Sequence, residues 1–384
     1  MANDKLQQRI EEIAQSWRED RATRQQRRHL ERADFDEVAD AGYLVLAVPR
    51  EQGGAWESVE ASTAPICRAL RTLAGGDSSV TLVSSMHPAV LSYWLASTDK
   101  SQPEWEEQRR AVFASATDGA RWGTITSEPG SGGDIMRTKT RAVPDESLDA
   151  PLPGPRYLLS GDKHFGSGLG IVDYMFTTAV ADGEDAPSGY FVDTHYLPDP
   201  SSKELTVTAE WDGAGMAATQ SHAAKFTAMP AVRLAWDRPL EELSLAAGPT
   251  IGALFTAVVL GILDEAIGLA RAQLEPRRES LRAFEQVEWA QAELEHWLAV
   301  QAYDGALRAV ERAEPYERLR AVIRAKTAVA QLAERSLSRV TRVLGGGTYS
   351  RRSPFSGWYE DVRALGFLRP PWGLAFDQLY ATSF

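Results

Sequence analysis

The stretch TSEPGSGGD, from Thr126 to Asp134, sets three glycines and two serines around a proline, and it follows a short β-like run, WGTI at 122–125. Glycine reaches backbone conformations that other residues avoid, and a loop with few side chains exposes its N–H groups. Such a backbone can approach a planar, acceptor-rich ring and its phosphates closely. The stretch therefore predicts a ligand-binding loop at the start of a β region.

Length and composition limit the class of protein. The 384 residues exceed the roughly 250–300 at which single cores divide, so two or three structural units are expected. A net charge of −12 opposes binding to nucleic acid, which requires clustered Lys and Arg. One cysteine, Cys67, excludes an intramolecular disulfide and predicts no Cys-based metal site, which fits a reducing cytoplasm. The apolar run 251–263 is shorter than the ~20 residues of a membrane span, so it predicts a buried helix and no membrane partner.

Three regions differ in their hydrophobic pattern. Residues 1–117 repeat apolar positions at spacings of three and four, which is typical of amphipathic helices. Residues 118–236 hold short runs of Val, Thr, Tyr and Phe between turn residues, which predicts an antiparallel, barrel-like β domain. Residues 237–384 form long helical patterns with short connections, which predicts a four-helix bundle. The expected fold is an α+β multidomain chain of these three parts.

The boundaries of individual elements follow from the same patterns. We predict helices at 58–73, 78–95, 103–114, 248–274, 284–310 and 316–344, and strands at 156–161, 173–181, 188–193 and 204–211. Asp77 is expected to cap the second of these helices. The proline-rich segment 143–155 is expected to be an exposed hairpin loop.

Five motifs occur in a fixed order along the chain. They are VPREQGG (48–54), ITSEPGSGGD (125–134), GDKHFGSG (161–168), WDGAGMAATQSH (211–222) and VLGGGTY (343–349). Together they resemble motifs of the acyl-CoA dehydrogenase superfamily of flavoproteins over nearly the whole chain. The resemblance implies a flavin-dependent oxidoreductase that acts as a homodimer or homotetramer.

The resemblance also implies which residues bind the flavin. Ile125 and Ser127 are expected to flank the pyrimidine edge of the ring, and Gly132 and Gly133 to lie beside its phosphates. Asp134 is expected to brace the turn.

A second motif adds two flavin residues. Phe165 and Ser167 stand where the family has Trp and Thr, so they are expected beside the dimethylbenzene ring and N5. The spelling F-x-S-G also resembles the reduced-flavin monooxygenases of the superfamily.

In the family, a neighbouring subunit contributes an arginine, glutamines and a glycine pair to the outer half of FAD. The residues that stand nearest to these places are Arg277, Arg278, Arg342, Gly345 and Gly346. An arginine fork suits a pyrophosphate. FAD is therefore the expected cofactor, with FMN as the less favoured alternative.

The usual catalytic base is missing from the sequence. Oxidation of an acyl thioester between its α and β carbons requires a carboxylate that removes a proton. The commoner place for that glutamate in the family aligns with Arg369, and arginine cannot act as a base at neutral pH. The alternative place lies in the first bundle helix, where no carboxylate occurs between Glu242 and Asp264.

Three functions therefore stay open. An acyl-CoA dehydrogenase-like enzyme, our first expectation, would pass hydride from an acyl thioester to FAD and recruit Asp377 or Glu360 as its acid. A reduced-flavin monooxygenase would place His87, Ser167, Ser221 and His222 on the oxygen side. A catalytically inactive flavin-binding relative is the third. A flavin reductase or an electron-acceptor protein is the expected partner, and His87, Asp377 and Arg369 are the candidate catalytic residues.

Overall fold

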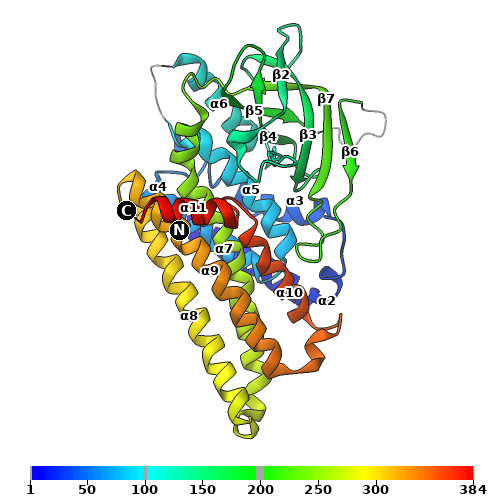
Figure 1. The fold of residues 1–384 in the computed structure, drawn as a ribbon, viewed down its shortest axis with the longest axis vertical. Helices are drawn as coiled ribbons and strands as arrows, with labels where there is room; N and C mark the ends of the chain where they lie inside the picture. The colour runs from blue at the N-terminus through cyan, green and yellow to red at the C-terminus, as the bar shows by residue number, and fades with distance from the viewer. Residues whose placement is uncertain (1, 98–101, 196–202, 384) are drawn as a thin grey trace.

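The computed structural model describes residues 2–97, 102–195 and 203–383 (Figure 1). The helices are α1 (Ala2–Glu19), α2 (Arg21–Arg24), α3 (Arg32–Asp40), α4 (Val59–Ala74), α5 (Ser78–Leu95), α6 (Pro103–Thr117), α7 (Leu240–Leu274), α8 (Ala283–Arg312), α9 (Pro315–Leu344), α10 (Pro354–Arg363) and α11 (Trp372–Ala381). The strands are β1 (Trp122–Thr124), β2 (Arg141–Pro144), β3 (Arg156–Gly166), β4 (Tyr174–Ala181), β5 (Pro187–Asp193), β6 (Leu205–Ala209) and β7 (His222–Arg233). The expected α+β fold of helices, a central β part and helices is confirmed.

Helix α5 is the centre of the N-terminal helices. Its residues are apolar or small all round, and nearly all of them are buried. Such a helix is stable only when other elements cover every face, and α4, α7 and β1 pack against it. Asp77 caps it as predicted, because the Asp77 carboxylate accepts a hydrogen bond from the Val80 N–H at 2.9 Å.

The strands close into a ring. β4 pairs with β2, β2 with β3, β3 with β7, β7 with β5, and β5 again with β4. Most pairs are antiparallel as expected, but β4 runs parallel to both β1 and β2. The loop from 125 to 140 therefore leaves the strand beside Phe176 and returns beside Val180, both on β4. The barrel holds both ends of this loop on one strand.

An aromatic cluster joins the barrel to the helices. Trp122 of β1 lies 5.3 Å, centroid to centroid, from Trp94 of α5 and from Phe191 of β5. All three side chains are buried. Rings at these separations attract beyond their burial alone, so the cluster fixes β1, and with it the start of the loop, against α5.

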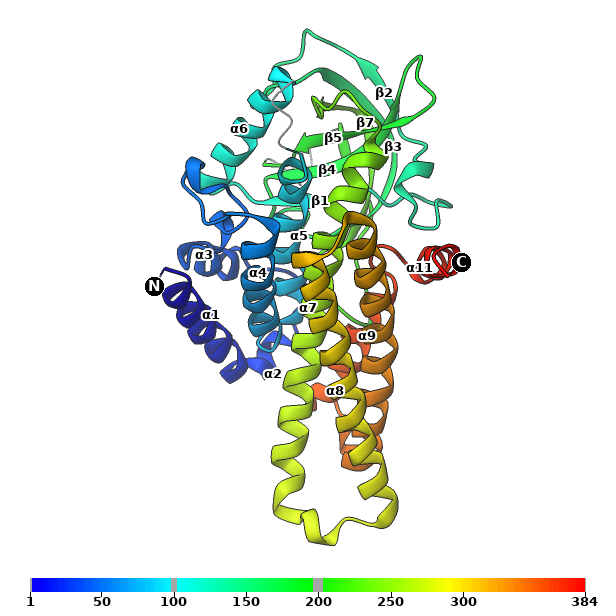
Figure 2. The ribbon, with the colours of Figure 1, turned by 90° about the vertical axis from the view of Figure 1, so that its left-hand side faces the viewer.

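Three long helices form the C-terminal bundle, and α10 packs along α7 and α9 as a shorter fourth member (Figures 1 and 2). α7 begins eight residues before the predicted start at 248, because Pro249 lies inside the helix and does not end it. Gly261 lets α7 touch α4, since a Cβ there would lie 2.1 Å from the Arg71 carbonyl oxygen. α7 is long and apolar enough to cross a membrane, but 78% of its apolar window is buried inside the fold.

Candidate functional site

The glycine loop adopts a backbone that few other residues could follow. Gly130, Gly132 and Gly133 have φ of 78°, 65° and 80°, in the left-handed region. Gly132 faces open space, whereas a Cβ on Gly133 would lie 2.8 Å from the ring of Pro371. Asp134 braces the turn as expected, because its carboxylate accepts a hydrogen bond from the Met136 N–H at 2.9 Å. The loop thus exposes bare backbone on one side and packs on the C-terminal segment on the other.

A buried ion pair joins the loop to β3. Lys163 donates to Glu128 at 2.6 Å and to the Thr178 carbonyl at 2.8 Å, and neither charged side chain reaches solvent. Burial lowers the pKa of Lys163 to about 8, although Glu128 opposes this shift. Burial alone would raise the pKa of Glu128, but Lys163 and the hydroxyls of Thr138 and Thr140 lower it. Both groups are therefore charged at neutral pH, and they fix the base of the loop.

Ile125 and Ser127 lie at the start of the loop but differ in what they expose. The Ile125 N–H donates to the Phe176 carbonyl at 2.8 Å, its carbonyl accepts from Thr177 at 2.6 Å, and its side chain is fully buried. Ser127 accepts a hydrogen bond from the His164 N–H at 2.8 Å through its carbonyl. Within the described chain, the Ser127 hydroxyl makes no hydrogen bond. Of the two, only Ser127 offers a polar group to a ligand.

Phe165 stands at the end of β3 in a strained conformation. Its φ is 58°, which is rare for a bulky residue. Its ring is 57% exposed and meets Trp211 edge to face at 6.1 Å. An exposed aromatic ring on a strained backbone suits a surface that a planar ligand covers.

Ser167 begins a buried chain of hydroxyls. Thr219 donates to the Met216 carbonyl at 2.8 Å, so its oxygen accepts from Ser221 at 2.7 Å. Ser221 has then used its proton and accepts from Ser167, also at 2.7 Å. Since each hydroxyl has one proton, the chain runs in a single direction. Ser167 therefore presents lone pairs, and no proton, to its remaining side.

Arg369 lies in the segment that packs on the glycine loop. It is half-buried, and burial lowers its pKa. Among the described residues it makes no hydrogen bond or ion pair, and the Asp134 carboxylate acts on its charge. The buried Lys326 of α9 supports this segment by donating to the Pro370 carbonyl at 2.6 Å. Figure 2 shows α11, which follows this segment, on the side to which the loop projects.

Asp361 of α10 anchors the loop that carries Met216 to the helices. Its carboxylate accepts from the Met216 N–H and from the Ser78 hydroxyl, both at 2.6 Å. Burial raises the pKa of Asp361 to about 6. This side chain thus ties together α10, the start of α5 and the hydroxyl chain.

This pKa predicts a pH-dependent contribution to stability. The ordinary value is 3.8, so the folded protein holds this proton to a higher pH than the unfolded chain does. The stabilisation is complete below about pH 4 and is lost as the pH rises to about 6, up to about 3 kcal/mol. We expect Asp361→Asn to flatten this part of the profile of unfolding free energy against pH, measured by urea denaturation between pH 4 and 7. Equal slopes in the two proteins would contradict the assignment.

His87 is held by backbone on both sides. Its Nε2 lies 2.8 Å from the Leu44 carbonyl, and its Nδ1 accepts from the Trp122 N–H at 3.1 Å. Burial lowers its pKa to about 4. No ring nitrogen is left for a proton transfer, so this geometry is that of a core histidine. Asp377 is exposed on α11, and its catalytic role stays a prediction.

The expected outer-half cofactor residues form a separate group at the far end of the bundle (Figure 1). Arg277 donates to the Val343 carbonyl, Arg278 pairs with Glu275, and Arg342 pairs with Glu288. Gly345 and Gly346 follow α9 at the same end. Within one chain, these residues do not meet the glycine loop.

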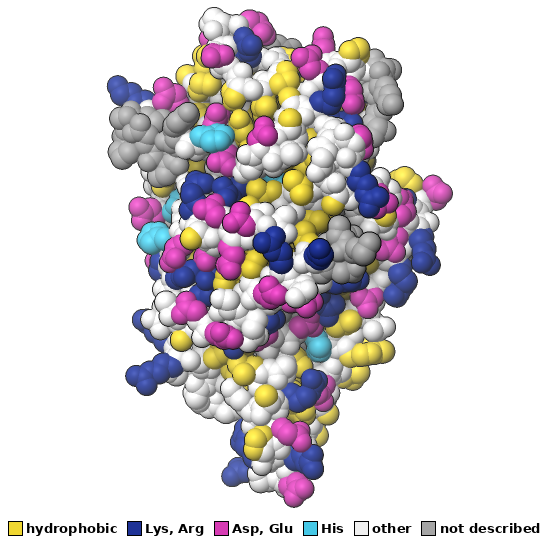
Figure 3. Space-filling view, turned by 180° about the vertical axis from the view of Figure 1, so that it is seen from behind, with side chains coloured by type: hydrophobic (Ala, Val, Ile, Leu, Met, Phe, Trp, Pro, Cys, Tyr) yellow, Lys and Arg dark blue, Asp and Glu magenta, His cyan; other side chains and the backbone are white. Residues whose placement is uncertain are grey.

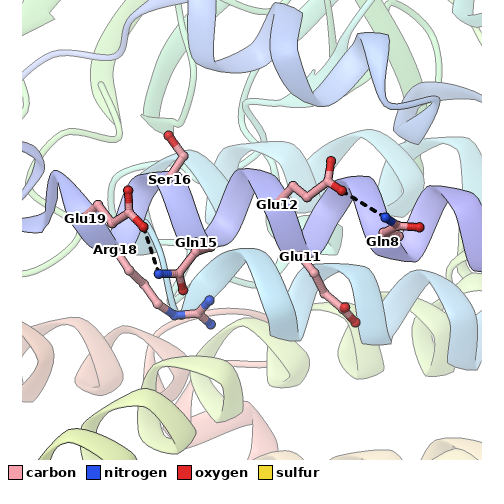
Figure 4. Close-up of a pocket in the computed structure, with 7 residues that line it drawn as sticks. All are labelled: Gln8, Glu11, Glu12, Gln15, Ser16, Arg18 and Glu19. Atoms are coloured by element: carbon pink, nitrogen blue, oxygen red, sulfur yellow. Dashed lines mark hydrogen bonds between the residues drawn. The ribbon is translucent and has the colours of Figure 1, made fainter.

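Two other features of the surface are a hollow and the distribution of charge. A hollow along α1 is lined by residues of that helix alone, joined by hydrogen bonds such as Gln8–Glu12 (Figure 4). On the face opposite to Figure 1, acidic and basic side chains are intermixed (Figure 3). In the described ranges, no three His, Cys, Asp or Glu side chains are placed to hold a metal ion.

The residues at the loop fit a flavin. The open side of Gly132 would admit a ligand close to the backbone, Phe165 offers an uncovered ring, and Ser127 has a free hydroxyl. These features come together because Ser127 pairs with His164, the neighbour of Phe165. The Glu128–Lys163 pair and the Ser167–Ser221 contact were not predicted, although all four residues stand in the quoted motifs.

These elements, in this order and with this loop, make the fold of the acyl-CoA dehydrogenase superfamily. No protein-family model matches the chain. It is similar to the dibenzothiophene monooxygenase of Rhodococcus erythropolis, at 26% identity over 217 residues, which are 56% of this chain and 46% of that protein. The match thus spans about half the length of that relative.

Two solved structures share the fold over almost the whole chain. FMN-bound TdsC from Paenibacillus sp. A11-2 matches with a TM-score of 0.79 at 18% identity, covering 98% of this chain and 96% of that one. KijD3 in complex with FMN and a dTDP-linked amino sugar matches with a TM-score of 0.81 at 22% identity, covering 100% and 93%. These similarities show that the chain has the same fold as the two proteins.

Proposed function

We propose that the protein is a monooxygenase that uses reduced flavin delivered by a separate flavin reductase. The observation that carries the proposal is the pairing of two features at one loop. Arg369 stands where a dehydrogenase of this fold has its carboxylate base, and Ser167 heads a one-directional hydroxyl chain. An arginine in place of the base disfavours removal of a proton from a substrate carbon. The direction of the hydroxyl chain favours binding of the reduced flavin ring.

Three of the carboxylates considered as bases already have partners, and the fourth, Asp377, is exposed on α11. Glu128 is neutralised by Lys163, and Asp134 caps the turn of its own loop. Glu360 pairs with Arg363 at 2.7 Å on α10. A base for an acyl thioester must reach the proton it removes, and none of these groups is free to do so. The dehydrogenase function, our first expectation, therefore has less support than the monooxygenase function.

The polarity of the hydroxyl chain supports the reduced state of the cofactor. A reduced flavin carries an N–H at N5, where the oxidised ring has only an acceptor. Ser167 offers an acceptor oxygen, because its proton is committed to Ser221. A bound reduced flavin supplies the electrons that activate oxygen. Ser167 would orient the ring, Phe165 would cover its edge, and the packing of Pro371 on Gly133 would exclude water from that side of the loop.

We propose FMN as the cofactor, in place of the FAD expected from the sequence. The arginines expected to hold the outer half of FAD are bonded to groups of their own chain, at the other end of the bundle. The two solved structures named above hold FMN. Titration of the purified protein with FMN and FAD, followed by flavin fluorescence, tests this choice.

The function itself is tested by two parallel assays. We expect oxygenation of a small aromatic compound only when the protein, NADH, FMN and a flavin reductase are all present. Addition of acyl-CoAs to the flavin-loaded protein without oxygen is expected to leave the flavin colour unchanged. Bleaching by an acyl-CoA would contradict the proposal and support the dehydrogenase. Silence in both assays would support an inactive flavin-binding relative.

A further inference from the structure

We infer that Arg369 is the binding group for a negatively charged substrate, a carboxylate or a phosphate ester. The inference rests on the proposed function, because it places this substrate beside the same loop. A charged side chain that is withdrawn from water usually has a partner. Arg369 is half-buried, yet among the described residues it makes no hydrogen bond or ion pair.

The surrounding groups leave the guanidinium of Arg369 without a direct partner. Asp134 and Tyr93 act on its charge from nearby, but among the described residues no carboxylate makes an ion pair or hydrogen bond with it. Lys163, the other cation that acts on it, is already paired with Glu128. The N–H groups of the guanidinium are therefore left for the oxygens of an anion, which an arginine fork suits.

A second polar group lies beside the same tyrosine. The Ser244 hydroxyl of α7 is buried and interacts with the Tyr93 phenol. Ser244 and Arg369 both act on the phenol of Tyr93, which is buried on α5 and stacks on Phe176 at 4.5 Å. A guanidinium, a hydroxyl and a phenol thus converge from three separate segments, as a site for a polar group does.

The backbone that carries Arg369 is rigidly supported. Lys326 donates to the Pro370 carbonyl at 2.6 Å and lies 5.8 Å from the centre of the Trp372 ring. Pro371 packs on Gly133 of the glycine loop. A guanidinium on such a support loses little conformational freedom when it binds two oxygens of an anion. A substrate bound to Arg369 and a flavin bound to the glycine loop would then lie on opposite sides of the contact between Pro371 and Gly133.

Calorimetric titration of the purified protein tests the inference with benzoate, its neutral analogue benzamide, phenyl phosphate and inorganic phosphate. We expect benzoate or phenyl phosphate to bind about 10- to 100-fold more tightly than benzamide, the range of one charge-assisted contact. Arg369→Gln should abolish the preference and Arg369→Lys should keep part of it, while Arg351→Gln, which changes an exposed arginine, should leave it intact. The stronger of the two anions identifies a carboxylate or a phosphate ester as the substrate class.

Several outcomes would overturn the inference. They are equal binding of benzoate and benzamide, no binding of any anion at millimolar concentration, and a preference that survives in Arg369→Gln. Preference for inorganic phosphate, together with loss of FMN binding in Arg369→Gln, would assign the arginine to the cofactor. Circular dichroism verifies that each variant is folded, and Arg369→Lys gives a second test if Arg369→Gln is not. Because these titrations need no flavin, their result is independent of whether the wild-type protein binds FMN or uses oxygen.

Discussion

Replacing Lys163 with methionine is expected to lower the free energy of unfolding by about 3 to 5 kcal/mol, because Glu128 would keep a buried charge without its partner. Chemical denaturation with urea at pH 7 measures the change. The double variant Glu128→Gln with Lys163→Met should recover part of the loss, since removing both charges also removes their desolvation cost.

Lys139 provides a matched control for this experiment. It lies on the same loop, but its side chain is exposed. The Lys139 ammonium group makes one long contact, at 3.5 Å, with the Pro129 carbonyl. Lys139→Met should change the unfolding free energy by less than about 0.5 kcal/mol. A comparable loss in both variants would mean that the Glu128–Lys163 pair has no special role.

Replacing Ser167 with alanine is expected to lower oxygenation about 100-fold, the usual cost of losing one positioned hydrogen-bonding group. Affinity for reduced FMN should fall about 10-fold, whereas affinity for oxidised FMN should stay nearly the same, because only the reduced ring has an N–H at N5 for the serine oxygen to accept. Binding titrations of both redox states under nitrogen, together with oxygenation rates, measure the two effects.

Ser160→Ala is the control for Ser167→Ala. Ser160 lies on β3, which ends just before Ser167; it is exposed, and its side chain accepts a hydrogen bond only from the Ala228 N–H at 3.1 Å. The Ser160→Ala variant should keep the wild-type rate of oxygenation. If Ser167→Ala weakened the binding of oxidised and reduced FMN equally, the direction assigned to the hydroxyl chain would be refuted.

The helices were predicted well because helical spacing and capping residues mark them in the sequence. α5 begins and ends at the predicted residues, and the predicted starts of α8 and α9 are within one residue of those observed. β7 was not predicted, since its alanines and Pro230 lack the branched and aromatic residues of a typical strand. Its contacts with β3, β5 and β6 stabilise it, and such long-range pairing leaves no local signal.

The parts of the site whose backbone is fixed by a motif could be predicted from the sequence. The parts that depend on contacts between distant residues could not. Glycine spacing located the loop and Asp134 as its brace. The pairing of Glu128 with Lys163 joins a loop residue to a strand residue that lies 35 positions later in the sequence. His87 was expected on the oxygen side of the flavin, but its Nδ1 accepts a hydrogen bond from the Trp122 N–H of β1. Residue type alone could not have revealed that contact.

The attachment of residues 125–140 to one strand at both ends has a practical consequence for protein engineering. The entry and exit lie four positions apart on β4, a gap of about 13 Å at strand spacing. A segment that bridges that distance and keeps Glu128 against Lys163 could be grafted there as a cassette. New ligand preferences could thus be screened by exchanging one short insert, without redesigning the scaffold.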